Sequence, residues 1–343
     1  MRARLGLALA TALIVAACGG GANTAVSPTT APSGSAAPTS PAVAKVRASY
    51  GNITPTNLPA FFAKETGIFQ ANFLDVDLQL IEGGSKSMAA LLGNQVDIAG
   101  LGGTEAMSAF VGGGDIAALA LFAPVSTWTF MVPPSYRGPQ DLKGKSLGIV
   151  TKGGSAHVAL NDALKRLGVD PKEVTIAEIG SVPNLATAMI AGAVYAGPSH
   201  PPESSVLTKA GFKVVVDLAK EKVPATDNAL IVGKTYLRAN TAVVQRYVDS
   251  LIQALAKARK DKPAAVAVLK KMLNLTDEQS LSETYDFYFG GVFPVYPHPD
   301  LAAFESSRVQ LIQTNPKVAD LDPKRLIDDS FVADAEKRGV AGK

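Results

Sequence analysis

The sequence predicts an α/β fold built from two similar lobes. The chain has 343 residues, enough for a sizeable hydrophobic core in each of two lobes. Short apolar strands alternate with short helices from Val46 to Gly197, an order typical of βαβ units and a mostly parallel sheet. A gapless shift of 98 residues places seven apolar positions of the first half on apolar positions of the second half. Two similar lobes give such a match, although shared βαβ periodicity alone gives it as well.

The first lobe is predicted to begin with residues 46–127. Apolar residues alternate along its strands and recur at helical spacing in its helices. Asn57 is placed to cap the first helix, and Gly67 follows the end of that helix. The predicted strands are 46–50, 76–80, 96–101 and 116–122, and helices around Phe61, Met88 and Met107 separate them.

The second lobe is predicted over residues 128–224, and residues 225–343 return to complete the first lobe. From Thr241 onward the pattern predicts mostly helices. The segments 124–130 and 223–228 then cross between the lobes and form the hinge. The predicted elements of the second lobe are strands 128–132, 147–150, 174–179, 194–197 and 214–216, with helices 155–167 and 185–191.

The N-terminal segment is predicted to lie outside both lobes. Two arginines precede a largely apolar stretch of thirteen residues, Leu5 to Ala17, which is too short for a membrane-spanning helix but typical of a signal-peptide core. Val15-Ala16-Ala17-Cys18 resembles the lipobox of bacterial lipoproteins, in which the leader is removed and the cysteine is lipidated. We therefore expect a lipoprotein signal peptide over 1–17, a lipidated Cys18 and a disordered Gly/Ala/Ser/Thr/Pro tether over 18–45. This places the protein on the extracytoplasmic face of the membrane; the alternative is an ordinary signal peptide with an incidental cysteine.

The composition argues against several classes of function. The formal net charge is +3 and falls to +1 without the two leader arginines, which leaves no basic excess for nucleic acid. The sequence has one cysteine and contains neither HExxH nor a P-loop nor a Cys/His cluster for a metal. The stretch 153–157 resembles a nucleophile elbow, but its last residue is His157 rather than glycine. We therefore expect a protein that is not an enzyme, with no cofactor, no metal and no nucleic-acid partner.

Five segments resemble, in their order and spacing, one family of binding proteins. They are Leu58–Phe69, Val76–Ser85, Ala90–Ala99, Asp141–Lys145 and Leu167–Val174. The family is the substrate-binding proteins of ABC importers for nitrate, alkanesulfonates, taurine and thiamine-precursor pyrimidines, and the resemblance spans residues 46–333. It implies a two-lobe periplasmic-binding-protein fold of type II and a monomer. It also implies capture of a small molecule between the lobes by hinge closure, and delivery to an ABC permease with its cytoplasmic ATPase.

Two other functions are compatible with this resemblance, and the sequence differs from the family motif at one place. A receptor that reports its ligand to a membrane kinase would use the same cleft, and enzymes of thiamine-pyrimidine synthesis share the fold but depend on a cysteine-rich motif. The family usually repeats Gly-x-Val-Asp-Ala before Glu-Pro, whereas residues 192–196 here place Tyr195 at the acid, and Glu-Pro is missing. The ligand therefore stays open between a small anion and a flat heterocycle.

Ligand-binding residues are predicted at the carboxyl ends of the strands, where parallel α/β sheets bind their ligands. Four strand-to-helix turns combine glycine with serine or threonine, and the helix starts offer unpaired N–H groups that suit an anion. Capping alone explains any one of these turns. Glu105 is interpreted as a dipole partner of its helix start rather than a ligand carboxylate. The predicted ligand-binding residues are Tyr50, Asn52, Gly84, Ser85, Gly103, Thr104, Trp128, Gly154, Ser155, His157, Ser181, Ser199 and His200.

Overall fold

The computed structural model describes residues 41–342, which lie in one compact unit. The predicted signal peptide, Cys18 and most of the predicted tether lie outside these residues. Strand β1 (Ala44–Tyr50) opens the fold two residues before the predicted start at Val46. None of the helices in the described part of the chain is long and apolar enough to span a membrane.

A five-stranded sheet with the order β2-β1-β3-β10-β4 forms the centre of the first lobe. Strand β1 lies parallel to β2 and β3, whereas β10 runs antiparallel to β3 and β4. The direction of β10 is reversed because this strand enters the sheet on its return from the second lobe. The other strands of the sheet are β2 (Leu74–Leu80), β3 (Ile98–Leu101), β4 (Ile116–Val125) and β10 (Pro224–Gly233).

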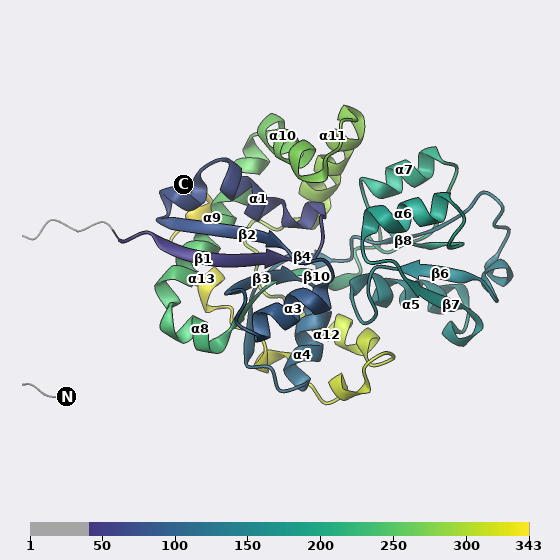
Figure 1. Ribbon diagram of the computed structural model, residues 1–343, viewed down its shortest axis with the longest axis horizontal. Coiled ribbons are helices and arrows are strands. Elements are labelled where there is room, and N and C mark those ends of the chain that lie inside the picture. The colour runs from purple at the N-terminus through teal and green to yellow at the C-terminus, as the bar shows by residue number, and fades with distance from the viewer. Residues whose placement is uncertain (1–40, 343) are drawn as a thin grey trace, which may run out of the picture. The chain divides into compact units, whose positions relative to one another are not determined.

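Helices cover both faces of this sheet (Figure 1). Successive residues of β4 point to opposite faces, so that Ala118 joins one hydrophobic core and Leu119 joins the other. An irregularity in the pairing of β4 with β10 then breaks the alternation and places Leu121 in the same core as Ala118. The larger core is covered by α1 (Leu58–Glu65), α2 (Ile68–Ala71), α9 (Thr241–Lys260), α10 (Lys262–Leu273), α11 (Glu278–Phe287) and α13 (Ser330–Lys337). The smaller core is covered by α3 (Gly84–Leu92), α4 (Gly103–Val111) and α12 (Leu301–Leu311), and α8 (Lys234–Ala239) follows β10.

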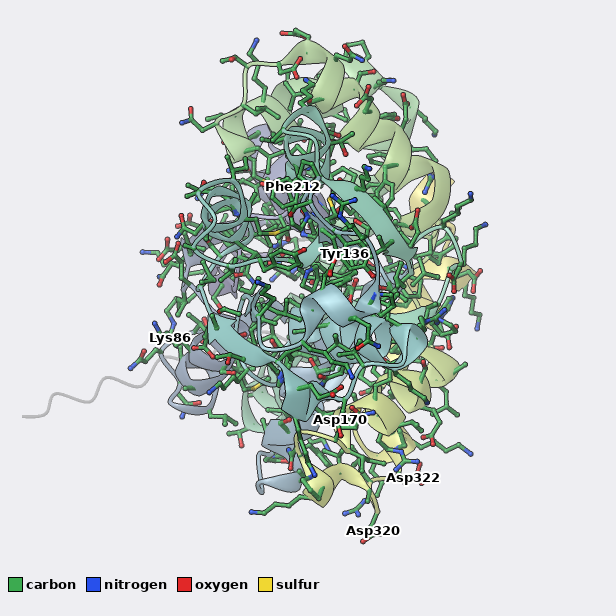
Figure 2. The ribbon with its side chains drawn as sticks, turned by 90° about the vertical axis from the view of Figure 1, so that its right-hand side faces the viewer. Lys86, Tyr136, Asp170, Phe212, Asp320 and Asp322 are labelled. Atoms are coloured by element: carbon green, nitrogen blue, oxygen red, sulfur yellow. The ribbon has the colours of Figure 1, made fainter. Side chains whose placement is uncertain are left out.

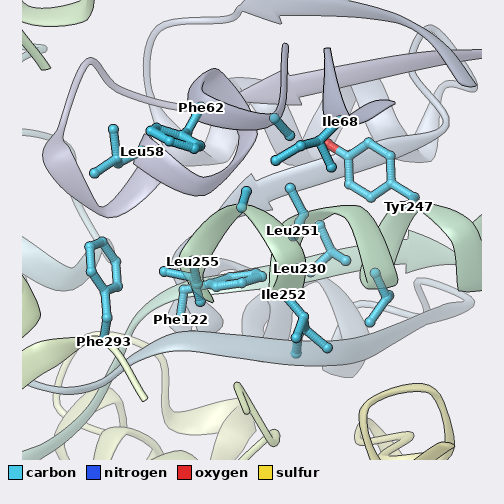
Figure 3. Close-up of a cluster of buried hydrophobic side chains, with 14 of the residues drawn as sticks. Leu58, Phe62, Ile68, Phe122, Leu230, Tyr247, Leu251, Ile252, Leu255 and Phe293 are labelled. Carbon is cyan, nitrogen blue, oxygen red and sulfur yellow. The ribbon is translucent and has the colours of Figure 1, made fainter. Parts of the chain in front are cut away.

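The larger core joins α1 and α9 to the sheet (Figure 3). Leu251 and Leu255 lie four residues apart on α9 and therefore share one face of that helix. Phe62 of α1 packs in the same cluster and is fully buried. The strand residues of this cluster are buried as well. This packing fixes the N-terminal end of α1, and with it the loop after β1 that reaches the site described below.

The second lobe contains an antiparallel sheet with the order β8-β5-β9 and a parallel pair β6-β7. A parallel bridge between Leu147 and Ala196 joins the two pieces, so the strands follow one another as β7-β6-β8-β5-β9. The parallel part is confined to β7, β6 and the bridge, because β5 arrives from the first lobe in the opposite direction. The elements are β5 (Thr129–Val132), β6 (Ser146–Ile149), β7 (Thr175–Glu178), β8 (Gly197–Ser199), β9 (Lys213–Asp217), α5 (Ser155–Leu167), α6 (Val182–Ile190) and α7 (Glu203–Lys209).

The two lobes repeat one topology. The shift of 98 residues carries α3 onto α6 at both ends, and it brings the ends of β2 and β3 onto the ends of β7 and β8. In each lobe the fourth strand of the order has crossed over from the other lobe, β10 in the first and β5 in the second. The apolar match in the sequence therefore reflects two similar units, not periodicity alone.

Two segments cross side by side between the lobes. The chain passes from β4 to β5 through Ser126, Thr127 and Trp128, and it returns from β9 into β10. The backbone N–H of Ser126 donates to the carbonyl of Val223 at 2.7 Å. The N–H and hydroxyl of Thr127 both donate to a carboxylate oxygen of Asp227, at 2.6 and 2.8 Å. The two crossings are thus tied to each other, which suits a hinge that bends as one unit.

Helix α5 begins and ends where the sequence predicts, whereas two strands start two or three residues later than expected. Strand β8 begins at Gly197 instead of Val194, because the N–H groups of Ala193 and Val194 still donate to the carbonyl of Ala188 at the end of α6. Strand β3 likewise begins at Ile98 instead of residue 96. The turn after α3 persists through Gln95, whose N–H donates to the carbonyl of Ala90.

Candidate ligand-binding site

A cavity of about 40 Å³ lies where the two lobes and both crossing segments meet. It exceeds the space that one water molecule needs, but it holds only a few non-hydrogen atoms in this arrangement of the lobes. The first lobe contributes Asn52, Thr54, Thr56 and Glu105, and the crossings contribute Thr127, Trp128 and Asp227. The second lobe contributes Val150, Thr151, Ser155, Ala156, Val182 and His200. Any movement of one lobe against the other therefore changes the cavity.

Trp128 and His200 form the aromatic side of the cavity. Their rings meet edge to face with centroids 4.8 Å apart. The indole of Trp128 is 5% exposed, and its N–H has no hydrogen-bond partner in the described part of the chain. Burial lowers the pKa of His200 to about 4, so this imidazole is neutral at pH 7. The aromatic side therefore offers one unused donor and no positive charge.

His200 also connects the cavity with the first lobe. Its Nδ1 lies 3.0 Å from the carbonyl of Pro201 and 3.3 Å from the hydroxyl of Tyr288, which is fully buried at the end of α11. Glu203 stands behind the ring, with its Oε2 3.9 Å from the same nitrogen. Burial raises the pKa of Glu203 to about 7, which favours the uncharged carboxyl next to a neutral imidazole.

Glu105 is the buried carboxyl of the first lobe. It lies in the first turn of α4, is 8% exposed, and accepts a hydrogen bond from the hydroxyl of Thr104 at 2.8 Å. Burial raises its pKa to about 7, with a smaller contribution from the charge of Asp227. The same carboxyl lines an outer groove of about 320 Å³, which it shares with Ser85 and Lys152. Glu105 thus stands between the inner cavity and an open approach.

Asp227 brings a second carboxyl to the cavity from the returning crossing. Burial raises its pKa to about 6, although the two hydrogen bonds from Thr127 favour the ionised form and so limit the rise. The indole N–H of Trp128 faces the same carboxyl and favours its ionised form to a smaller extent, although it lies outside normal hydrogen-bond geometry. Neither Asp227 nor Glu105 is paired with a lysine or arginine in residues 41–342.

Four of the predicted residues line the cavity: Asn52, Trp128, Ser155 and His200. Asn52 presents a buried side-chain oxygen that has no partner among the described residues. Two predicted glycines, Gly84 and Gly154, instead lie against the carboxyl of Glu105. The predicted Thr104 donates to that carboxyl and lines a smaller neighbouring cavity of about 10 Å³.

The remaining predicted residues lie elsewhere. Tyr50 packs edge to face on Phe61 and lines a separate cavity beside α1. His157 does not line the cavity; its Nδ1 accepts from the N–H of Gly153 at 2.9 Å and so holds the turn before α5. The others serve the local structure or face the groove: Ser85 lines the outer groove, Gly103 packs against Thr226, and Ser181 caps α6. Ser199 is buried in β8, and its hydroxyl has no hydrogen-bond partner among residues 41–342.

Charged side chains near the helix starts turn away from the cavity. Lys86, in the first turn of α3, is exposed and projects outward from the protein (Figure 2). Lys152 precedes α5 and is exposed at the outer groove. The cavity lining itself contains two carboxyl groups and no lysine or arginine within the described residues.

Sequence reasoning missed Asp227 and assigned Glu105 to its helix alone. Asp227 lies in β10, the largely apolar strand that returns from the second lobe. An acidic residue within such a strand is the sequence feature that could have indicated a cavity residue. Glu105 follows Gly102 and Gly103, and those glycines were interpreted as room for an external ligand. The threonines Thr54, Thr56, Thr127 and Thr151 carry no local pattern that separates cavity residues from ordinary turns.

The anomalous Tyr195 has a structural explanation in the repeated topology. The shift of 98 residues relates Asp97 to Tyr195 and Arg47 to Lys145. In the first lobe the carboxylate of Asp97 accepts from the backbone and side chain of Arg47. In the second lobe the Lys145 ammonium lies over the Tyr195 ring, 5.4 Å from its centroid. The acid that is missing at Tyr195 thus corresponds to the partner of a basic residue within the lobe, and not to a residue that lines the cavity.

The sequence matches a known family of proteins. The family model described as NMT1/THI5 like matches residues 54–265, and the chain therefore belongs to the NMT1/THI5-like family. The chain is also 26% identical over 203 residues to the protein named "Putative binding protein YtlA" of Bacillus subtilis (strain 168). That match covers 57% of this chain and 60% of YtlA.

Solved structures share the fold over most of the chain. A protein from Bordetella bronchiseptica RB50 matches with a TM-score of 0.75 and 22% identity, over 86% of this chain and 98% of its own. The alkanesulfonate-binding protein SsuA from Xanthomonas axonopodis pv. citri, bound to MOPS, matches with a TM-score of 0.68 and 20% identity, over 86% and 99%. The desulfurization enzyme DSZB matches with a TM-score of 0.64 and 18% identity, over 86% and 99%. The shared architecture is thus that of periplasmic binding proteins, and an enzyme has it too.

Proposed function

We propose that this protein is the extracytoplasmic solute-binding component of an ABC importer. It captures a small molecule between its lobes and delivers it to the permease. One observation carries the proposal: a single cavity takes side chains from both lobes and from both crossing segments. A ligand in that cavity contacts both lobes only when they are closed, so it favours the closed state by its extra contacts there. Among the described residues that line the cavity, no nucleophile is hydrogen-bonded to a base, which supports binding rather than catalysis.

The ligand is proposed to enter when the lobes separate about the crossings. The closed cavity of about 40 Å³ is smaller than the pockets of 300–1,000 Å³ typical of drug-sized ligands. The outer groove of about 320 Å³ beside Glu105 gives an approach on one side. The hydrogen bonds of Ser126 and Thr127 across the two segments keep these together while the lobes move.

The first test is a thermal-shift screen of the purified protein. The panel contains nitrate, taurine, alkyl and aryl sulfonates, dicarboxylates, thiamine precursors, riboflavin and a set of organic amines. A ligand at one hundred times its Kd adds about 2.7 kcal/mol to the free energy of unfolding, which shifts the melting temperature measurably. Small-angle scattering then measures closure as a fall in the radius of gyration on binding. A protein that binds a ligand without any change of shape contradicts the hinge mechanism.

Membrane attachment is proposed to occur through lipid on Cys18 and the tether that follows it. The expected result is that the expressed protein fractionates with membranes and incorporates a labelled fatty acid. The matched variant Cys18→Ser, which keeps every residue of the folded lobes, is expected to lose both properties. Equal membrane association of both proteins contradicts the lipid anchor but leaves the binding function untouched.

A further inference from the structure

We propose that the carboxylate of Glu105 occupies an anion cradle formed by three helix starts and thereby selects a ligand with a cationic group, a small organic ammonium or amidinium. This inference rests on the proposed binding function and names the class of ligand. It differs from the expectation of an anion that the glycine-rich turns give in the sequence.

The cradle is formed by the first residues of α3, α4 and α5. A Cβ atom added at Gly84, the first residue of α3, would overlap a carboxylate oxygen of Glu105. One added at Gly102, the N-cap of α4, would overlap the other oxygen, and one at Gly154, the N-cap of α5, would lie 2.9 Å from Oε1. Glycine at all three positions therefore lets three helix starts approach a single carboxyl.

Helix starts attract negative charge. The first N–H groups of a helix lack partners within it, and the helix dipole adds a partial positive charge at that end. Three such ends around one point make a site for an anion. In this protein the chain itself supplies the carboxyl, since Glu105 fills the place that a sulfonate, nitrate or carboxylate of a ligand would take. Burial outweighs the helix starts and raises its pKa to about 7, so a bound cation completes the ionisation of this carboxyl.

The rest of the cavity also disfavours an anionic ligand. Asp227 adds a second carboxyl, and the lining within residues 41–342 includes no lysine or arginine. His200 is neutral at pH 7, and Lys86 projects away from the cavity. An anion placed beside two carboxyl groups in a buried site meets unfavourable charge without compensation. A cation meets the opposite situation, because it supplies the partner that both carboxyl groups lack.

Two unpartnered polar atoms independently indicate a ligand at this place. The N–H of Trp128, whose side chain is more than nine-tenths buried, lines the cavity near the carboxyl of Asp227 but makes no hydrogen bond of normal geometry within residues 41–342. The side-chain oxygen of Asn52 lines it without a donor. Buried polar groups in native proteins are nearly always paired, so these atoms are expected to meet the ligand. Asn52 and the carboxyls accept N–H groups of the cation, and Trp128 donates to an acceptor elsewhere on the ligand.

The protonation state of Glu105 provides a second way to detect a bound cation. Because the pKa of free Glu105 is raised to about 7, part of the population carries a proton there at neutral pH, and a bound cation expels it. The groups that face Glu105 are Thr104 on α4, Asp227 on β10 and, across the outer groove, Lys152 ahead of α5. His200 stays neutral from pH 6 to 8, whereas the raised pKa values of Glu105, Asp227 and Glu203 lie in that range, so these three carboxyl groups govern proton release there.

The test uses cations and anions of matched shape. The probes are methylammonium, benzylammonium and benzamidinium, with methanesulfonate, benzenesulfonate, benzoate and sulfate as the anions. Calorimetry and thermal shift are expected to show that the wild-type protein binds at least one cation and none of the anions. Calorimetry in buffers of different ionisation enthalpy is expected to show proton release, and affinity for the cation is expected to rise from pH 6 to 8.

Two variants of Glu105 separate its charge from its bulk. Glu105→Gln keeps the shape and the bond to Thr104, and it is expected to weaken cation binding tenfold or more. Glu105→Ala vacates the cradle, and it is expected to gain binding of sulfate or a sulfonate that the wild-type protein lacks. The control Glu82→Gln, which removes an exposed carboxylate just before α3, is expected to change neither affinity.

Several results overturn the inference. They are unchanged cation affinity in Glu105→Gln, a folded Glu105→Ala protein that gains no anion binding, and a wild-type protein that binds anions and no cation. The last result leaves the proposed binding function intact, because the protein still closes on a small molecule. A wild-type protein that binds none of the probes and none of the wider panel contradicts both proposals.

Discussion

The substitution Glu105→Gln is expected to stabilise the ligand-free protein above pH 7. The carboxyl has an ordinary pKa of 4.5 and a pKa of about 7 in the folded protein, so folding disfavours its ionised form. One pKa unit corresponds to about 1.4 kcal/mol, so the ionised group lowers the free energy of unfolding by about 3 kcal/mol once the pH exceeds 7. Glutamine has the same shape, keeps an oxygen for the hydroxyl of Thr104 and carries no charge.

The sign of the pH dependence follows from the raised pKa. Below pH 4.5 the carboxyl is protonated in both the folded and the unfolded protein, and glutamine offers no advantage. Between pH 4.5 and 7 the unfolded protein loses its proton first, so the stability of the wild-type protein falls relative to the variant. The advantage of the variant is then complete above pH 7.

The assay is urea unfolding of both proteins at pH 5, 6, 7 and 8, followed by circular dichroism. The lowered pKa of His200 works in the opposite direction, since its protonation destabilises the folded protein at low pH. Comparing the two proteins at each pH removes that contribution, because both contain His200. A difference that is constant over this pH range, or a variant that is the less stable protein at pH 8, refutes the reasoning.

Three further predictions concern packing and ligand contacts. Gly197→Ala places a Cβ 2.8 Å from the carbonyl oxygen of Gly148 and is expected to lower the free energy of unfolding by about 1–3 kcal/mol. In the control Gly233→Ala the new Cβ enters open space, so the free energy of unfolding should change little. Urea unfolding of both variants measures the difference. Phe62→Ala removes a fully buried ring and is expected to cost about 3–5 kcal/mol in the same assay; a loss below 1 kcal/mol contradicts the described core. Thr104→Ala combined with Ser155→Ala is expected to weaken ligand binding without unfolding the protein, and unchanged affinity by calorimetry contradicts that site assignment.

Much of the fold follows from local sequence patterns. The apolar residues of α5 recur at helical spacing between Gly154 and Gly168, so both ends of this helix are predictable. The starts of β3 and β8 are not, because they depend on how far the turns after α3 and α6 persist, and those turns are fixed by backbone hydrogen bonds. The antiparallel strands β5 and β10 follow from the crossing of the chain between lobes, which the strand pattern alone does not express.

The site is less accessible to sequence reasoning than the fold. The glycine-rich turns were found, but the sequence does not say that a carboxyl of the chain itself fills the space they leave. Glu105 lies at the third position of a helix, where an acid is ordinarily explained by the helix dipole. Asp227 faces the cavity only because its strand returns beside Thr127, a contact between residues one hundred positions apart. The burial of these two carboxyl groups, and the hydrogen bonds between residues so far apart in the sequence, are set by the tertiary structure and cannot be predicted from local sequence patterns.

Trp128 gives the protein a built-in optical reporter. It is the only tryptophan in the sequence, and it lies both on a crossing segment and on the wall of the cavity. The tryptophan fluorescence of the unlabelled protein, excited at wavelengths that the eight tyrosines do not absorb, therefore arises from one indole. The neighbouring imidazole of His200 is uncharged at pH 7, so it provides no cationic quencher for that indole at rest. Emission at longer wavelength, from an indole in contact with water, marks an open and hydrated site, and a shift to shorter wavelength marks its closure. A single spectral titration thus follows both ligand arrival and the motion of the lobes, without any attached dye.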